Sequence, residues 1–235
     1  RSKLPNGLFL ICGPTGTGKS TTLASILRNL QKNYSKKIIT IEKPIEYVYP
    51  KDGKALVVQR EVGIDCLSFY NGLTATAREN ADIILIGEVR DSEEVGQLLR
   101  AAEMAHLAIS TMHTNAVATT LNRIQALFSG TDRNRILSQL GDTLRGLANQ
   151  VLVKSIDGQS VSAVREILTI DENTRKFIQT GDVQGLRDYQ FAHKITMEDN
   201  LVKAIKARRC TFAEGRSKSS FPDVFDKIAK REGLI

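Results

Sequence analysis

The residues with the clearest chemical potential form a glycine-rich run near the start of the chain. From Gly13 to Ser20 the sequence reads GPTGTGKS, which matches the pattern G-x-x-x-x-G-K-[ST] in full. In such a run, glycines let successive backbone amides turn inward, and the amides form an anion-binding nest at a helix N-terminus. An apolar run precedes the motif and a stretch with helical spacing follows it, which is the context that a phosphate-binding loop requires. The candidate phosphate-binding residues are Gly13, Pro14, Thr15, Gly16, Thr17, Gly18, Lys19, Ser20 and Thr21.

Two residues of this loop and one acid beyond it have specific expected roles. Lys19 is expected to reach the β- and γ-phosphates of ATP, and Ser20 to offer its hydroxyl to Mg²⁺. Hydrolysis also needs an acid near the metal. Glu88 follows the apolar run 83–86, so we expect it at the phosphate side of the sheet. We predict that Glu88 helps hold Mg²⁺, partly through water, or polarises the attacking water. A helix N-cap role is the alternative, although Ser92 and Asp91 are better placed to cap that helix, and we expect Ser92 to do so.

Two more polar residues follow predicted strands and are candidates for the same site. Glu42 ends the strand 37–41 and is the leading candidate for activating water, with Glu46 as a second choice. A surface acid paired with a lysine is the alternative for Glu42. His113 follows the strand 106–111 and is a candidate to contact the γ-phosphate, or else it is a structural hydrogen-bonding residue. His106, at the start of that strand, is a weaker candidate.

The elements that must position these residues alternate between apolar strands and helices. This alternation predicts an α/β fold with a mostly parallel sheet flanked by helices. Together with the phosphate-loop motif, it indicates a P-loop NTPase (RecA-like). After about residue 171 the strand signal stops, and the rest predicts short helices broken near Gly181, Gly215 and Pro222. We expect an ATPase core over 1–170 and a helical C-terminal subdomain over 171–235. The predicted strands cover 8–12, 37–41, 55–59, 83–86, 106–111, 151–154 and 161–168.

Composition excludes several classes of protein. Hydrophobic residues make up 41% and charged residues 25% of the 235, as in ordinary soluble proteins. No apolar run reaches the ~18 residues of a membrane-spanning helix. The three cysteines are too far apart for a CxxC zinc site or a disulfide framework, which fits a reducing cytosol. The net charge of +7 is compatible with nucleic acid or anionic lipid as a partner, although a solvated helix face is the favoured interpretation.

In the order of these motifs the chain resembles the type IV pilus retraction ATPases, which belong to the wider type II and type IV secretion ATPase superfamily. The segments QREVG, ITMEDNLVKAIKARRCT and SSFPDVF also match, so the resemblance covers nearly the whole chain. The four segments that carry it are GPTGTGKSTTL at 13–23, TIEKPIEYV at 40–48, DIILIGEVRD at 82–91 and AAEMAHLAISTMHTNAVATTLNRI at 101–124.

The resemblance implies a hexameric motor that hydrolyses ATP with Mg²⁺ near the interface between subunits. It implies a cytoplasmic protein, peripheral at the inner membrane, that acts on the membrane platform of a pilus or secretion machine. Glu42, Glu88 and His113 occupy the matching positions. The resemblance also indicates that Arg60, Arg78 and Arg90 stabilise the transferring phosphoryl group or act across the interface, although each is equally compatible with a surface salt bridge. Family members carry a PAS-like domain before the motor, and we expect one upstream of this chain.

The sequence departs from the family pattern at a few positions. Lys43 stands where the family usually has Asp, and 78–82 reads RENAD where the family has REDPD. The four-cysteine zinc insertion of the assembly ATPases is absent, which favours a retraction-like ATPase or the conjugation and type IVB secretion branch. A DNA-translocating motor, a P-loop kinase and a nucleotide-binding module without hydrolysis remain alternatives.

Overall fold

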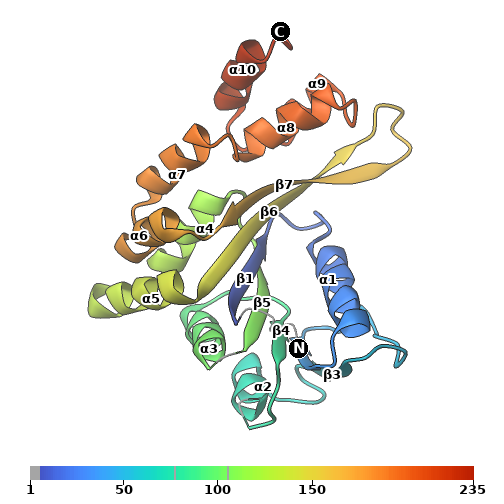
Figure 1. The fold of residues 1–235 in the computed structure, drawn as a ribbon, viewed down its shortest axis with the longest axis vertical. Coiled ribbons are helices and arrows are strands. Elements are labelled where there is room, and N and C mark those ends of the chain that lie inside the picture. The colour runs from blue at the N-terminus through green and yellow to red at the C-terminus, as the bar shows by residue number, and fades with distance from the viewer. Residues whose placement is uncertain (1–5, 77, 105) are drawn as a thin grey trace.

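The computed structural model describes residues 6–76, 78–104 and 106–235, and its described strands form one seven-stranded sheet (Figure 1). The strand order is β3-β2-β4-β5-β1-β6-β7. Every neighbouring pair is parallel except β6 and β7, which form an antiparallel hairpin. The predicted mostly parallel α/β sheet is therefore confirmed. The strands are β1 Gly7–Cys12, β2 Lys37–Glu42, β3 Leu56–Glu61, β4 Ile83–Ile86, β5 Leu107–Met112, β6 Leu144–Lys154 and β7 Val161–Thr169.

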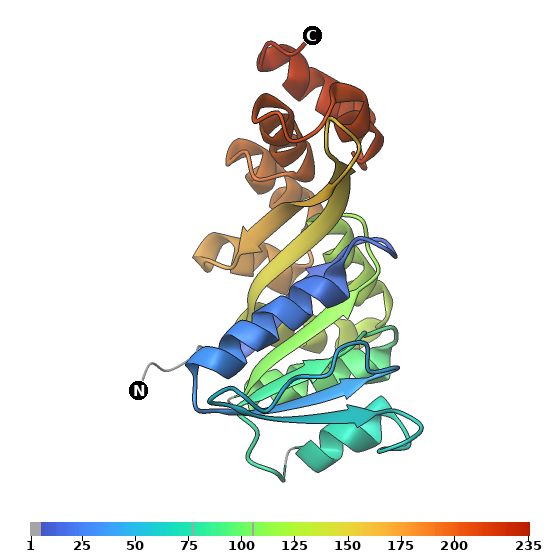
Figure 2. The same cartoon turned by 90° about the vertical axis from the view of Figure 1, so that its right-hand side faces the viewer.

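Helices cover both faces of the sheet because the central strands are apolar on both sides. In β1, Leu8 and Leu10 pack in the core under α3 to α5, while Ile11 packs under α1 with Leu27, as expected for alternating side chains. Figure 2 shows α1 on one face and the green helices on the other. The helices are α1 Lys19–Asn33, α2 Phe69–Thr76, α3 Ser92–Glu103, α4 Val117–Ala126, α5 Gly130–Thr143, α6 Glu172–Thr180, α7 Val183–Ala192, α8 Met197–Lys206, α9 Phe212–Ser217 and α10 Pro222–Arg231.

The C-terminal helices pack in two different places. Ile178 of α6 and Leu186 of α7 belong to the large core under the sheet. A separate cluster joins α8 to α10 with the far end of the β6–β7 hairpin, where Val153 packs with Phe225. In Figure 1 these last helices lie beyond the hairpin, away from α2. The division at about residue 170 stays a prediction.

Two local expectations are wrong. The helix α3 is capped by Asp91, whose side chain accepts a hydrogen bond from the Glu94 amide at 2.9 Å, and not by Ser92. Gly215 lies inside α9 and does not break it. A Cβ atom at Gly215 would lie 2.7 Å from Cδ1 of Ile205, so this glycine lets α9 approach α8 closely.

Two of the expected helix boundaries are correct. Gly181 ends α6 with a left-handed φ of 69°, and Pro222 is the first residue of α10. Across the described part of the chain, no helix combines the length and the apolar character needed to cross a membrane.

Candidate functional site

The loop between β1 and α1 has the backbone conformation of a phosphate nest. Gly13 has a φ of 150°, and Gly16 and Gly18 each have a φ of 77°, a region that side chains disfavour. Gly18 is the N-cap of α1, so the loop runs directly into the positive end of that helix. These backbone angles are compatible with an anion-binding nest of loop amides at the N-terminus of α1.

Lys19 brings a positive charge to the mouth of this loop. Its side chain is buried, and Nζ donates to the carbonyl oxygens of Gly13 at 2.8 Å and Pro14 at 3.0 Å. Burial lowers the pKa of Lys19, while the nearby carboxylate of Glu88 acts in the opposite direction. The ammonium group is thus held beside the loop rather than in bulk solvent.

Glu88, Arg90 and His113 form a connected group at the ends of β4 and β5. Glu88 Oε1 lies 3.1 Å from His113 Nε2, and Glu88 Oε2 accepts a hydrogen bond from Arg90 at 2.6 Å. His113 Nδ1 lies 3.4 Å from both Lys19 Nζ and Thr15 Oγ1. Burial acts to raise the pKa of Glu88, but the Arg90 hydrogen bond and the surrounding positive charges bring it below its ordinary value. Glu88 is therefore held as a carboxylate beside the loop.

Glu42 ends β2, the strand next to β4, and its carboxylate has polar and acidic neighbours. Its Oε1 accepts hydrogen bonds from Thr40 at 2.6 Å and from Gln59 at 3.3 Å. Burial raises its pKa, and the neighbouring acids Glu46 and Glu61 add to that rise. A carboxylate with a raised pKa is a better proton acceptor near neutral pH.

These groups line a cavity of about 500 Å³ at the carboxyl ends of the strands. This arrangement agrees with the expectation that the phosphate loop and the strand-end acids meet in one place. A cavity with this lining can bind a phosphate chain with two carboxylates beside that chain. Its walls also exclude part of the solvent. Among the predicted residues, the cavity is lined by Thr15, Gly16, Gly18, Lys19, Ser20, Thr21, Glu42, Glu46, Glu88, Arg90 and His113.

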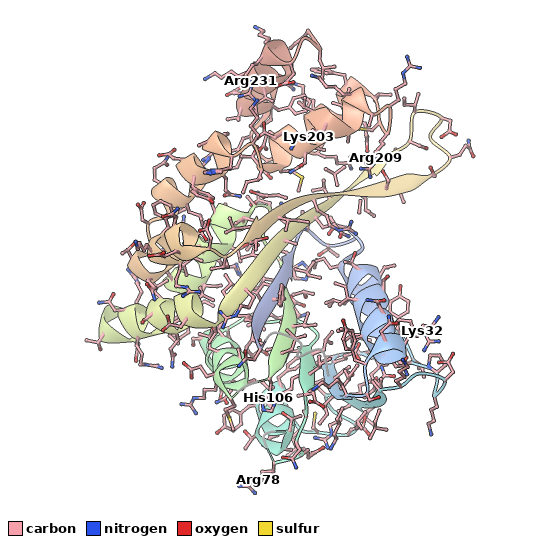
Figure 3. The ribbon with its side chains drawn as sticks, in the orientation of Figure 1. Lys32, Arg78, His106, Lys203, Arg209 and Arg231 are labelled. Carbon is pink, nitrogen blue, oxygen red and sulfur yellow. The ribbon has the colours of Figure 1, made fainter. Side chains whose placement is uncertain are left out.

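Some predicted residues lie away from this cavity. Arg60 pairs with Glu79 at 2.6 Å, outside the cavity lining. Arg78 lines a separate hollow between α2 and α3 together with His106, and Figure 3 shows both residues at the α2 end of the molecule. His106 Nδ1 contacts the carbonyl oxygen of Ala81 at 2.6 Å, which is a structural hydrogen bond. Arg60 and Arg78 therefore do not reach the cavity of their own chain.

The sequence interpretation missed one buried residue that touches the phosphate loop. Gln150 of β6 is 1% exposed, and its Nε2 donates to the carbonyl oxygen of Thr17 at 2.6 Å. Arg165 of β7 donates to Gln150 Oε1 at 2.8 Å. The available signal was the polar pair Asn149 and Gln150 directly before the apolar run 151–153.

Comparison with known proteins places the chain in one family. Residues 2–216 match the family described as type II/IV secretion system protein. A relative from Pseudomonas aeruginosa, the "Type IV pilus retractation ATPase PilT", is 38% identical over 218 residues, which cover 88% of this chain and 63% of the relative. The chain thus spans about three fifths of the length of such relatives.

Two solved structures share the fold. The first is described as the crystal structure of the pilus retraction motor PilT and bound ADP, with a TM-score of 0.88 and 38% identity, covering 95% of this chain and 64% of that one. The second is the ATPase DotB of Legionella pneumophila, with a TM-score of 0.81 and 29% identity, covering 91% of this chain and 60% of that one. The fold of this chain is therefore shared with solved ATPases of pilus and secretion systems.

Proposed function

The chain belongs to the type II/IV secretion system protein family, and on this premise we propose that it is the ATPase motor of a type IV pilus or a related secretion machine. The reaction is ATP + H₂O to ADP + phosphate. The observation that carries the proposal is that the phosphate loop, Glu42, Glu88 and His113 line one cavity. Relatives that are described as a pilus retraction ATPase and a retraction motor with bound ADP support it.

The loop residues bind the nucleotide. The inward amides between Gly13 and Ser20 hold the β- and γ-phosphates, and Lys19 adds its charge to the same place. Because Lys19 Nζ is already fixed by two loop carbonyls, little side-chain freedom is lost when a phosphate binds.

The donor set of the cavity fits Mg²⁺. In proteins this ion keeps several waters and is held by one or two carboxylates together with substrate phosphates. Ser20 supplies a hydroxyl and Glu88 a carboxylate that the structure holds ionised, and both line the cavity. When bound, the ion would neutralise charge on the β- and γ-phosphates. The described residues contain no group of three or more His, Cys, Asp or Glu that would hold a metal ion alone, and in this proposal phosphate oxygens and water would complete the site.

The remaining groups act on water and on developing charge. Glu42, with its raised pKa, accepts a proton from the attacking water or orients it. His113 lies within 3.4 Å of Lys19 Nζ, so it senses the occupant of the loop and passes the change to Glu88. Arg90 stabilises negative charge on the transferring phosphoryl group.

We further propose a homo-hexamer with the nucleotide near the interface between subunits. Arg60 and Arg78, which do not reach the cavity of their own chain, would then act from a neighbouring subunit. An upstream PAS-like domain and the inner-membrane platform of the machine complete the working assembly, with the motor peripheral on the cytoplasmic side.

A conjugation or type IVB secretion ATPase is the second candidate, supported by the likeness to DotB. Nucleic acid is a less favoured partner than a protein platform, because several basic side chains of the C-terminal helices pair with acids. Examples are Lys206 with Glu232 and Arg216 with Asp226. Stimulation of ATP hydrolysis by DNA that falls steeply with salt would instead support a DNA-translocating motor.

Turnover of MgATP tests the proposal most directly. We expect phosphate release from the wild-type chain and background release from Lys19→Ala, because that variant loses the charge beside the phosphates. Lys32→Ala is the control, since Lys32 is exposed in the last turn of the same helix (Figure 3). No nucleotide binding by the wild type, or full turnover by Lys19→Ala, would contradict the proposed function.

A further inference from the structure

The strand β6 continues past the end of β1 and runs beside the phosphate loop. Cys12, the last residue of β1, is in register with Asn149, so Gln150 lies alongside the first loop residue. A Cβ atom at Gly13 would lie 2.5 Å from the carbonyl oxygen of Gln150, which shows how closely the two backbones approach. The side chain of Gln150 is therefore in a position to act on the loop itself.

The carboxamide of Gln150 makes three hydrogen bonds there. Nε2 donates to the carbonyl oxygen of Thr17 at 2.6 Å, while Oε1 accepts from Thr22 Oγ1 at 2.9 Å and from Arg165 Nε at 2.8 Å. The orientation of the amide is unambiguous because the Thr17 carbonyl can only accept and the Arg165 guanidinium can only donate. One buried side chain thus contacts the middle of the loop and the first turn of α1.

The contact with Thr17 controls the direction of a loop amide. In a planar trans peptide, the carbonyl and the following N–H point in opposite directions. Holding the Thr17 carbonyl toward β6 therefore directs the N–H of Gly18 away from β6, to the side where the nest is formed. Gly18 is in the left-handed region and has no side chain to restrict its backbone. Without the contact from Gln150, the peptide plane between Thr17 and Gly18 would rotate more freely.

Arg165 in turn holds Gln150. The two residues are directly opposite each other in the β6–β7 hairpin, and the Arg165 guanidinium also lies 3.3 Å from Thr22 Oγ1. We propose that Gln150, oriented by Arg165, is a positioning residue that fixes the phosphate loop in its binding conformation and so sets nucleotide affinity. This inference rests on the proposed function, because it concerns the same nucleotide site.

The chain contains a matched control for this chemistry. Gln31 is also buried, and its Nε2 donates to the carbonyl oxygen of Pro50 at 2.6 Å while its Oε1 accepts from Arg28 at 2.7 Å. It lies near the far end of α1, roughly 18 Å from Lys19 at 1.5 Å per residue. A change from amide to carboxylate therefore has the same local consequences at both positions, but only Gln150 touches the loop.

The experiment compares Gln150→Glu, Gln150→Met and Gln31→Glu with the wild type at pH 8. The probes are titration of a fluorescent ADP analogue with Mg²⁺ and the dependence of phosphate release on MgATP. Both Gln150 variants leave the Thr17 carbonyl without its donor, so we expect Kd and KM to rise about tenfold or more. The kcat at saturating MgATP should change less than threefold, because Glu42 and Glu88 are untouched. Gln31→Glu should bind as the wild type does.

The split between KM and kcat separates positioning from a loss of folded protein. Partial unfolding would lower kcat in proportion to the active fraction and leave KM unchanged. Unchanged nucleotide affinity in both Gln150 variants would overturn the inference, and so would an equal loss in Gln31→Glu. Failure of the wild type itself to bind or hydrolyse nucleotide would contradict the proposed function instead.

Discussion

Glu88 Oε1 lies 3.1 Å from Nε2 of His113, and this contact joins the ends of β4 and β5. The two strands are parallel neighbours, with Ile86 in register with Ser110, so residues just beyond their ends meet on one edge of the sheet. On the other side of the ring, His113 Nδ1 lies 3.4 Å from Lys19 Nζ at the mouth of the phosphate loop. The phosphate loop and the acid are thereby connected through one imidazole ring.

Replacement of Glu88 tests its role in the chemical step. Glu88→Gln keeps the shape of the side chain but removes the charge expected to act on metal and water. We predict a fall in kcat on the order of 10²-fold or more. Affinity for ADP without Mg²⁺ should stay within about threefold, because amides and Lys19 hold the phosphates.

The control for this experiment is Glu93→Gln, since Glu93 is exposed in the first turn of α3 on the same segment. We expect that variant to hydrolyse ATP at the wild-type rate. Equal kcat values in Glu88→Gln and the wild type would remove Glu88 from the mechanism.

The choice between Glu42 and Glu46 as the group that acts on water can be decided from pH profiles. A base works only when ionised, so kcat falls as the pH drops through its pKa. Burial raises the pKa of Glu42, so this acid limb should lie above the range near 4.3 of an exposed glutamate. We predict that Glu42→Gln lowers kcat at least tenfold and loses the limb, whereas Glu46→Gln keeps it. A limb that persists in Glu42→Gln would assign the titration to another group.

The parts of the site that sequence reasoning predicted are those that depend on strand ends. Local patterns identify four of these residues: the glycine-rich motif contains Ser20, and apolar strands precede Glu42, Glu88 and His113. The carboxyl ends of parallel strands meet on one edge of the sheet, whatever the strand order is. No knowledge of long-range packing was needed to expect these four groups in one cavity, where the structure brings them together.

The contacts of Gln150 could not be predicted in the same way. They require the antiparallel register of β6 and β7, which places Arg165 opposite Gln150, and this register is set by pairing over the whole hairpin. The N-cap residue of α3 is a second feature that the sequence alone did not determine. Asp91 and Ser92 both suit an N-cap, and a boundary of one residue decides between them.

Two glycines of the loop should respond very differently to a methyl group. At Gly13 a Cβ atom would lie 2.5 Å from the carbonyl oxygen of Gln150 and 2.7 Å from Thr17 Oγ1, so alanine must displace the loop. At Gly16 a Cβ atom meets nothing within 4 Å, and the cost is backbone strain of about 1 kcal/mol. We predict that Gly13→Ala loses at least tenfold more ADP affinity than Gly16→Ala, as measured by titration calorimetry. Equal losses would indicate that the loop does not lie against β6.

Glu166 should make stability depend on pH. It is 4% exposed on β7 and accepts hydrogen bonds from the Val117 amide at 3.1 Å and from Gln190 at 2.6 Å. Burial raises its pKa to about 7 despite these donors, and nearby Glu198 adds to the rise. In the unfolded chain the pKa returns to about 4.3. Between these values the native state holds a proton that the unfolded chain has released, so the free energy of unfolding decreases as pH rises.

The stabilising contribution is fully present below pH 4.3 and is lost as pH passes through about 7. From pH 5 to pH 8 the loss due to this residue should be roughly 2 to 3 kcal/mol. Glu166→Gln cannot ionise, so urea unfolding of this variant should show a pH dependence smaller by that amount. Glu172→Gln is the control, because Glu172 is exposed at the start of α6 and should leave the slope unchanged. An identical slope in the wild type and Glu166→Gln would mean that Glu166 stays ionised in the folded protein.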